Sequence, residues 1–269
     1  RPGVGESGKR NTMAETSSPF RLDGKTVLIS GAGGGIGRSL IAAFHAAGAR
    51  VMGADRRADM LAGLELAGSV LFDQADPRAT RAAIETYLDA HGAPDAVISN
   101  AGFTRAETLD QLDDEVWASE LAINLSGAYA MTDPIVGVMA QRGSGSLVFI
   151  SSVNALGHYG NPAYAAAKAG LVAYARAIAV ERGGQGVRAN VICPGSVRTP
   201  AWDHRLAADP TLLDNVLPHY PLGRMVLPAE VANAAVFFAS AGITGTVLPV
   251  DAGLTAGNLR FVDDVLRGQ

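Results

Sequence analysis

The sequence predicts a single α/β domain: a doubly wound parallel sheet of about seven strands with helices on both faces. From Lys25 onward, short apolar runs alternate with longer helical ones, which is typical of parallel strands joined by crossover helices. A chain of 269 residues suits one such domain and is marginal for two. Its hydrophobic content of 48% and charged content of 18% indicate a substantial core.

Composition and charge exclude several classes of partner. A formal net charge of −4 and a pI near 5.7 give no basic footprint for nucleic acid or anionic lipid. The single cysteine, Cys193, excludes an internal disulfide framework, and no credible metal-ligand cluster is visible. No apolar run reaches the roughly 18 residues that span a bilayer, so we expect a cytoplasmic protein without a membrane partner.

The first segment of the chain differs from the rest. Residues 1–20 are polar, rich in glycine and serine, and lack the apolar core of a signal peptide. We expect a disordered N-terminus or a cloning remnant, with Met13 as the natural start. The α/β domain is expected over residues 21–269.

A glycine-rich turn follows the first predicted strand. The strand Thr26–Ser30 leads directly into Gly31-Ala32-Gly33-Gly34-Gly35-Ile36-Gly37 and a helix over 38–47. Such a turn lets the backbone approach a pyrophosphate, with the helix N-terminus facing the negative charge. The alternative, a flexible loop, does not account for the strand before it and the helix after it. We therefore expect cofactor contacts at Gly31, Gly35, Ile36 and Gly37.

The next strand, over 50–54, ends at Asp55, eighteen residues beyond Gly37. That is close to the roughly 20 residues expected before the acid that binds an adenosine ribose. A carboxylate there accepts from the ribose hydroxyls and repels a 2′-phosphate, which favours NAD over NADP. Arg56 and Arg57 argue the other way, although no basic residue lies within the glycine-rich turn to help them. Asp55 as a loop carboxylate or helix cap is the alternative.

Two further strand ends add candidate cofactor contacts. A third strand over 69–72 ends at Asp73, which is placed to accept a hydrogen bond from the adenine amino group. After the helix Pro77–His91, the strand Ala96–Ser99 delivers Asn100-Ala101-Gly102 to the carboxyl edge of the sheet, where open α/β sheets bind ligands. This second small-residue turn either contacts the cofactor or only stabilises the sheet edge.

A tyrosine and a lysine are the first candidates for chemistry. In a helix over 163–182, Tyr164 and Lys168 lie four residues apart and share one face. A cation beside a tyrosine favours the phenolate below the usual pKa of roughly 10. Of the 22 Lys plus Arg, only Lys9, Lys25 and Lys168 are lysines. A compact ammonium in a chain that prefers arginine indicates a role that arginine does not fill.

Two polar positions accompany this pair. A long helix over 113–139 carries Asn124 between apolar neighbours, a local conflict of the kind that marks functional sites. The strand over 146–150 ends in Ser151 and Ser152. Taken singly, the amide could be a buried group with a backbone partner and the serine an ordinary strand end.

The last third of the chain completes the sheet. A strand over 188–193 ends in Pro194-Gly195 ahead of Thr199, and a helix over 228–239 precedes a strand over 246–250. Residues 200–225 contain four prolines and several aromatic and basic side chains, which indicates a mobile substrate lid. Candidates to line a substrate pocket are His158, Tyr159, Trp202, His204 and Arg205. The tail 257–269 either closes the site of a neighbouring subunit or extends an interface.

In order and context these motifs resemble the short-chain dehydrogenase/reductase family over residues 22–254. The matching stretches are Gly31 to Gly37, Asn100-Ala101-Gly102, Asn124, Ser152, Tyr164-x-x-x-Lys168, and Pro194-Gly195 with Thr199. Ser30 stands where threonine is usual, and Ala252 where a second glycine is common. The segment from Ser152 to Tyr164 is one residue shorter than in many members, which leaves Ser151 as an alternative; Val153-Asn154 favours Ser152.

The resemblance implies a Rossmann fold and a role for each matched residue. Tyr164 is the implied general base in oxidation and general acid in reduction, and Lys168 is implied to lower its pKa and bind the nicotinamide ribose. Ser152 is implied to orient the substrate oxygen, and Asn124 to hold a water that links Lys168 to solvent. Pro194, Gly195 and Thr199 are implied cofactor contacts, with Thr199 on the carboxamide.

These expectations converge on an NAD-dependent oxidoreductase that interconverts a secondary alcohol and a ketone. Polar and aromatic lid residues favour a sugar, polyol or hydroxy acid, and the family implies a homo-oligomer, a dimer or tetramer. One alternative is a 3-oxoacyl-thioester reductase that uses NADPH. Another is a nucleotide-binding scaffold without catalysis, although such proteins usually lose the tyrosine or the lysine, and both are present here.

Overall fold

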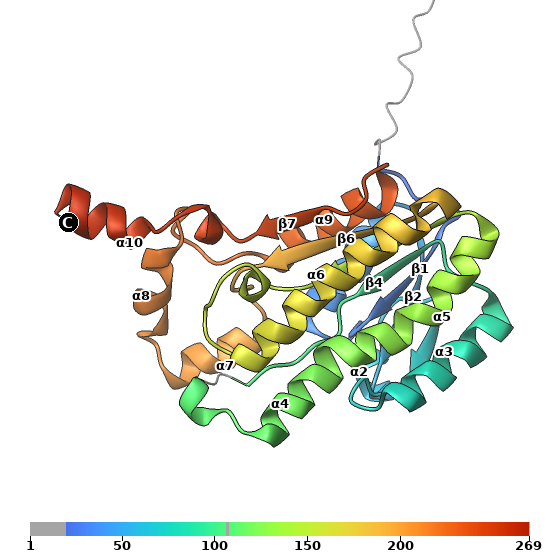
Figure 1. Ribbon diagram of the computed structural model, residues 1–269, viewed down its shortest axis with the longest axis horizontal. Helices are drawn as coiled ribbons and strands as arrows, with labels where there is room; N and C mark the ends of the chain where they lie inside the picture. The colour runs from blue at the N-terminus through green and yellow to red at the C-terminus, as the bar shows by residue number, and fades with distance from the viewer. Residues whose placement is uncertain (1–19, 106–107, 269) are drawn as a thin grey trace, which may run out of the picture.

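The protein is described by a computed structural model that places residues 20–105 and 108–268. Seven parallel strands form one sheet in the order β3-β2-β1-β4-β5-β6-β7 (Figure 1). The predicted fold class is confirmed, and every strand lies within one residue of its predicted bounds. The strands are β1 Thr26–Ser30, β2 Arg50–Asp55, β3 Gly68–Leu71, β4 Ala96–Ser99, β5 Gly145–Ile150, β6 Val187–Pro194 and β7 Val247–Val250. The expected N-terminal disorder falls on residues that lie outside the described part, except for Phe20.

Helices cover both faces of the sheet, and each face has its own apolar core. On one face α1 (Gly35–Ala46) and α9 (Pro228–Ser240) pack together on the strands through residues such as Phe44 and Phe238. On the other face α3 (Pro77–His91), α5 (Gly127–Arg142) and α6 (Pro162–Arg182) bury Ile84, Met131 and Leu171 (Figure 1). A short helix that the sequence did not indicate, α2 (Ala58–Leu61), follows β2.

The helix predicted over 113–139 is interrupted. It consists of α4 (Asp114–Leu121), a π turn over Ala122–Ser126 and α5, so Asn124 lies inside the π turn. A π turn widens the hydrogen-bond step from four residues to five, and such turns often occur at functional sites. Directly after it, a β-carbon on Gly127 would lie 2.3 Å from the carbonyl oxygen of Gln74, so the start of α5 packs closely against the segment that follows β3.

The segment predicted as a mobile lid is largely helical. It contains α7 (Pro200–Ala208), α8 (Leu212–Val216) and a 3-10 turn over Leu217–His219. Beyond β7, the chain forms α10 (Leu259–Phe261) and a π turn over Val262–Arg267, which project from the body next to α8 (Figure 1). Helix α7 begins immediately after Thr199 and therefore lies at the carboxyl edge of the sheet.

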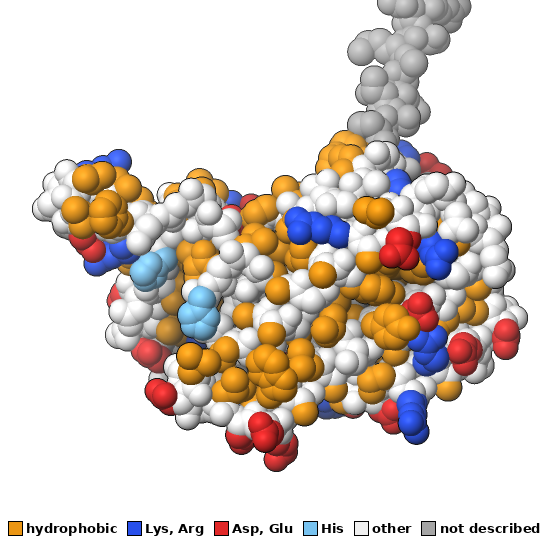
Figure 2. All heavy atoms as spheres, viewed as in Figure 1, with side chains coloured by type: hydrophobic (Ala, Val, Ile, Leu, Met, Phe, Trp, Pro, Cys, Tyr) orange, Lys and Arg blue, Asp and Glu red, His pale blue; other side chains and the backbone are white. Residues whose placement is uncertain are grey.

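Apolar side chains collect on the outer surface of α4, α5 and α6. Trp117, Tyr129 and Val180 are exposed there, Val180 to 82%. Figure 2 shows hydrophobic atoms spread over this face. Within residues 20–105 and 108–268, none of the helices combines the length and the hydropathy needed to cross a bilayer.

Candidate active site

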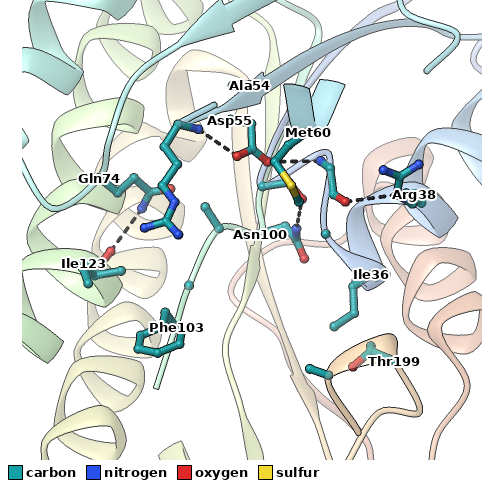
Figure 3. A pocket seen from close by; sticks show the side chains of 18 of the residues that line it. Ile36, Arg38, Ala54, Asp55, Met60, Gln74, Asn100, Phe103, Ile123 and Thr199 are labelled. Atoms are coloured by element: carbon teal, nitrogen blue, oxygen red, sulfur yellow. Dashed lines mark hydrogen bonds between the residues drawn. The ribbon is translucent and has the colours of Figure 1, made fainter. Parts of the chain in front are cut away.

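A cavity of about 570 Å³ opens at the carboxyl ends of β1 to β4 (Figure 3). The strand order reverses between β1 and β4, and open parallel sheets bind ligands in the crevice at such a point. Nine of the predicted cofactor residues line the cavity: Gly31, Gly35, Ile36, Asp55, Asp73, Asn100, Ala101, Gly102 and Thr199.

The glycine-rich turn brings bare backbone to the cavity. Helix α1 begins at Gly35, three residues before the predicted start, so the N–H groups of Gly35, Ile36 and Gly37 belong to its first turn. First-turn N–H groups have no intrahelical acceptor and favour an anion. A β-carbon on Gly35 would lie 2.8 Å from Cβ of Thr199. The floor of the cavity therefore fits the pyrophosphate of a dinucleotide.

Gly37 does not line the cavity but is needed for the turn to close on α1. A β-carbon there would lie 2.1 Å from the carbonyl oxygen of Gly31 and 2.7 Å from that of Ala32. We expect Gly37→Ala to lower the free energy of unfolding by roughly 3 kcal/mol, because backbone atoms cannot move aside cheaply. Gly183→Ala is the matched control, since Gly183 is helical with open space around it. Denaturant unfolding measures both; equal stability of the two variants would contradict the close approach.

Asp55 is held by the glycine-rich turn. Its Oδ2 accepts from the N–H of Gly33 at 3.2 Å and its Oδ1 accepts from the N–H of Arg56 at 2.8 Å (Figure 3). Arg56 also lines the cavity, whereas Arg57 forms an exposed ion pair with Asp59. Of the two arginines that argued for NADP in the sequence, only Arg56 therefore lines the cavity.

Arg38 is a second cation on the cavity, and the sequence argument had not considered it. Its Nε donates to the carbonyl oxygen of Gly33 at 3.1 Å (Figure 3). The sequence has no basic residue within the glycine-rich turn, but Arg38 is the first residue after it. With Arg56 it is one of two arginines that line the cavity.

The turn at Asn100 stabilises the sheet edge, and its residues Asn100, Ala101 and Gly102 also line the cavity. Asn100 Nδ2 donates to the carbonyl oxygens of Ser30 and Gly31 at 3.0 and 3.1 Å. Ser30 Oγ accepts from the N–H groups of Asn100 and Ala101, both at 3.0 Å. The hydroxyl that a threonine supplies in the family pattern is therefore present in Ser30. Ala252, the other departure, has φ +52°, a left-handed conformation that favours glycine.

Lys168 and Asn124 lie beside Gly102, and Tyr164 with its partner Ser152 lies next to the lysine. Lys168 Nζ donates to the carbonyl oxygen of Ile150 at 3.0 Å and lies 5.4 Å from the centre of the Tyr164 ring. Lys168 Nζ and Asn124 Oδ1 lie 3.1 and 2.9 Å from the position that a β-carbon on Gly102 would take. Gly102 thus joins the cavity to these side chains.

The structure separates the two serines at the end of β5. Ser151 Oγ donates to the carbonyl oxygen of Lys168 at 2.9 Å, so it braces α6. The side chain of Ser152 forms a hydrogen bond with Tyr164. Ser152 Oγ also lies 3.2 Å from both the N–H and Oδ1 of Asn154. The geometry favours Ser152, not Ser151, as the partner of the tyrosine.

Burial dominates the ionisation of the central pair. It raises the pKa of Tyr164 to about 12, and the hydrogen bond with Ser152 only partly opposes this rise. Burial also lowers the pKa of Lys168 to about 8, and electrostatic interactions with Cys193 and Glu120 only partly oppose this fall. The lysine was expected to hold the pKa of the tyrosine below its usual value, and here the cost of burying a phenolate outweighs that effect.

Several predicted residues lie away from the cavity. Pro194 and Gly195 do not line it; the N–H of Gly195 instead donates to the carbonyl oxygen of Val250. His158 and Tyr159 are exposed, and Trp202 lies against the guanidinium of Arg205 at 4.4 Å. The described residues contain no group of side chains that could hold a metal ion.

Other cavity residues were missed by sequence reasoning. Gln74 is buried, its Nε2 donates to the carbonyl oxygen of Ile123 at 3.2 Å, and its Oε1 has no partner among the described residues. A polar residue directly after the predicted adenine contact Asp73 was the signal that could have found it. The remaining missed residues are apolar and carry no such signal: Ala54, Met60, Phe72, Phe103, Ile123, Pro200 and Ala201.

Residues 31–255 match the family model described as Enoyl-(Acyl carrier protein) reductase. An uncharacterized oxidoreductase of Schizosaccharomyces pombe is 39% identical, over 91% of this chain and 96% of its own. A D-threitol dehydrogenase of Mycolicibacterium smegmatis is 35% identical, over 88% and 95%. A 3-oxoacyl-[acyl-carrier-protein] reductase of Thermotoga maritima is 33% identical, over 87% and 99%.

Solved structures agree with these relatives. A short chain dehydrogenase/reductase family oxidoreductase from Burkholderia thailandensis is 38% identical with a TM-score of 0.82, over 90% of this chain and 97% of its own. A gluconate 5-dehydrogenase from Burkholderia cenocepacia in complex with NADP and tartrate is 30% identical with a TM-score of 0.83, over 90% and 99%. The chain belongs to the short-chain dehydrogenase/reductase family, whose members are oxidoreductases that act on CH–OH groups.

Proposed function

We propose that the protein is an NAD-dependent oxidoreductase that interconverts a secondary alcohol and a ketone on a small polar substrate, with Tyr164 as the general acid and base. The observation that carries the proposal is that Lys168 and Asn124 approach Gly102, a residue that lines a cavity fit for a dinucleotide, while Tyr164 and Ser152 lie next to the lysine. When bound, the nicotinamide accepts a hydride from the alcohol in oxidation and donates one in reduction.

The side chains supply the proton and the geometry. At neutral pH Tyr164 keeps its proton, because its pKa is about 12, and it can donate that proton to a ketone oxygen. Ser152 orients the same oxygen through its hydroxyl. Lys168 keeps a positive charge beside the phenol, which favours the phenolate that forms during reduction. Asn124 would hold a water that returns the proton to Lys168 from solvent.

The preference for NAD rests on Asp55. Its carboxylate lines the cavity, and its position is fixed by the N–H groups of Gly33 and Arg56. A negative charge there repels a 2′-phosphate, whereas Arg38 and Arg56 attract one. The gluconate 5-dehydrogenase relative was solved with NADP, so the two nucleotides must be compared directly.

Asp55→Asn separates these influences. The variant keeps an oxygen that can accept from Gly33 but loses the charge. We expect the ratio of kcat/KM for NAD to kcat/KM for NADP to fall by roughly 10- to 100-fold, because the lost repulsion is worth about 1–3 kcal/mol at a partly exposed site. Asp89→Asn, at an exposed position of α3, is the control with the same loss of charge. An unchanged ratio in Asp55→Asn would refute its role.

The substrate class is proposed from polar groups on the lid and on the loop before α6, and from the relatives. Tyr159 on that loop and Trp202 and Arg205 on α7 offer hydroxyl, indole and guanidinium groups, which suit a sugar, polyol or hydroxy acid. The D-threitol dehydrogenase acts on a polyol by its name, in line with this class. The second candidate is a 3-oxoacyl-thioester reductase that uses NADPH, supported by the Thermotoga maritima relative.

A panel assay tests the proposal. Purified protein is mixed with NAD or NADP and with sugars, polyols, hydroxy acids and hydroxyacyl esters, and the absorbance of the reduced nicotinamide is followed. We expect the highest kcat/KM with NAD and a polyol, sugar or hydroxy acid. Turnover confined to NADPH and 3-oxoacyl thioesters would establish the second candidate. Binding of NAD without turnover of any substrate would favour a scaffold.

We also propose a homo-oligomer, a dimer or a tetramer. Its support is the apolar surface of α4, α5 and α6, where Trp117, Tyr129 and Val180 are exposed. Hydrophobic atoms are spread over this face (Figure 2), and exposed apolar surface often marks a protein interface. Light scattering on the purified protein gives the mass directly, and a monomer at micromolar concentration would contradict the expectation.

A further inference from the structure

A buried carboxylate lies behind the proposed catalytic residues and has no role in the chemistry proposed for them. Glu120 belongs to the last turn of α4, and only 3% of its surface is exposed. Burying a carboxylate is costly unless hydrogen bonds and charges compensate for the lost water. At a core-facing helix position whose only task is packing, an apolar side chain avoids that cost. The carboxylate therefore requires a functional explanation.

Both oxygens of Glu120 are hydrogen-bonded. Oε2 accepts from Asn124 Nδ2 at 2.8 Å, and Oε1 accepts from the N–H of Arg105 at 3.1 Å. Asn124 Nδ2 also lies 2.8 Å from the carbonyl oxygen of Phe103, and Asn124 Oδ1 accepts from the N–H of Phe103 at 3.2 Å. Because the carboxylate accepts only, it acts with the backbone of Phe103 and the carbonyl oxygen of Glu120, 3.0 Å from Nδ2, to set which end of the Asn124 amide carries the nitrogen.

This orientation turns the oxygen of Asn124 toward the lysine. Asn124 Oδ1 and Lys168 Nζ approach the same face of Gly102, at 2.9 and 3.1 Å from the position that a β-carbon would take. Glu120 thus lies one amide away from the buried ammonium. A carboxylate on the far side of this amide favours the charged form of the buried lysine and raises its pKa.

The groups that titrate around the pair come from three elements. Among the described residues, Glu120 on α4 and Cys193 on β6 face Tyr164 and Lys168 on α6. Glu120 raises the pKa of both, and for Lys168 it opposes the lowering that burial causes. Cys193 acts in the same direction, and its own pKa is raised by burial. Glu120 is the carboxylate among these groups.

We propose that Glu120 is a positioning residue of the proton-transfer centre, which orients the amide of Asn124 and holds a negative charge beside Lys168 so that the buried ammonium keeps its proton. The inference rests on the proposed function in one respect, that Tyr164 and Lys168 transfer the proton. Its electrostatic part, the tuning of Lys168, is independent of any substrate.

The three lysines of the chain make this part measurable without turnover. Protein labelled with ¹³C at the lysine ε-carbon gives one signal each for Lys9, Lys25 and Lys168, and the signal absent from Lys168→Met identifies the third. Its chemical shift is followed against pH in wild type and in Glu120→Gln. We expect the pKa of Lys168 to fall by roughly one unit in the variant, because the nearby negative charge is removed.

The control is Glu85→Gln, which removes the same charge from an exposed position of α3. In this variant the pKa of Lys168 should stay within about 0.2 units of wild type, since exposed distant charges are screened. A pKa of Lys168 that is equally unchanged in Glu120→Gln overturns the proposal. If the amide hydrogens that Glu120→Gln introduces opposite Asn124 Nδ2 prevent folding, Glu120→Leu replaces that variant with the same expected shift.

A second readout separates this inference from the proposed function. In ketone reduction, the loss of activity on the alkaline side should begin roughly one pH unit lower in Glu120→Gln, since the same lysine must stay protonated. A purely structural role lowers kcat without moving this limb, and that result also counts against the proposal. If Glu120→Gln shifts the pKa of Lys168 but wild type turns over no substrate, Glu120 still tunes the lysine. The proposed function is then refuted.

Discussion

Replacing Tyr164 with phenylalanine is expected to lower kcat by roughly 10³-fold in both directions, because the variant has no proton to give or take and a positioned acid or base contributes about 10²–10⁴-fold. Phenylalanine fills the same buried space on α6, so the cavity on the other side of Gly102 is left intact. The dissociation constant for NAD, measured by fluorescence titration, is therefore expected to change by no more than about threefold, or roughly 0.7 kcal/mol.

Tyr87→Phe is the matched control for this experiment. Tyr87 is also buried but lies on α3 beside His91, in a different part of the sheet. It should keep the kcat of wild type. Turnover by Tyr164→Phe within a few-fold of wild type would remove the tyrosine from the mechanism, whatever its hydrogen bond with Ser152.

Lys168→Met is expected to have the second largest effect, a fall in kcat of roughly 10²-fold or more. The change removes a charge that acts on the reacting phenol in a site shielded from water, and loss of one such group costs about 10²–10³-fold in other enzymes. Methionine is long and apolar enough to occupy the buried channel, although the carbonyl oxygen of Ile150 loses its donor. Lys25→Met, at an exposed ion pair with Asp95, is the control.

The pH dependence of ketone reduction distinguishes a charge from a space-filling role. Burial lowers the pKa of Lys168 to about 8, so the ammonium is present below that pH and is lost as the pH rises through it. Tyr164, with a pKa of about 12, stays protonated throughout this range. Wild-type activity should therefore fall above about pH 8, and the activity of Lys168→Met should show no such fall. The same alkaline fall in the methionine variant would show that another group titrates.

The strands and the turns that follow them could be predicted because each depends on a local signal. Buried parallel strands are short apolar runs, and the turns after Ser30, Ala54 and Ser99 carry glycine, aspartate or asparagine where the chain leaves the sheet. Since all the strands are parallel, these turns must meet at one edge. The sequence therefore predicted that Gly31, Asp55 and Asn100 lie close together.

The π turn at Asn124 could not be predicted in the same way. A step of five residues instead of four changes the hydrogen bonds but leaves the composition of the segment helical, so 113–139 was expected to be one helix. Residues 200–225 were expected to form a mobile lid, because the four prolines obscured two short helices. Proline is compatible with the first turn of a helix, and α7 begins with Pro200.

The ionisation of the site was the least predictable property. A lysine four residues from a tyrosine suggested a lowered tyrosine pKa, but burial depends on what α4, β5 and β6 pack against α6, which no local spacing contains. The position of Glu120 in the sequence could have predicted that its carboxylate is buried. It lies four residues before Asn124 and therefore shares its helical face, so an inward-facing asparagine implied an inward-facing carboxylate.

The central claim is that a hydride passes between a secondary carbinol carbon and a nicotinamide held in the cavity, while Tyr164 transfers the proton. The most direct measurement uses the best alcohol of the panel with deuterium at the carbinol carbon, and mass spectrometry of the cofactor recovered after turnover with NAD. We expect one deuterium in the reduced nicotinamide from wild type, and little reduced nicotinamide from Tyr164→Phe. Reduced cofactor without deuterium, or NAD that stays oxidised with every alcohol of the panel, would contradict it.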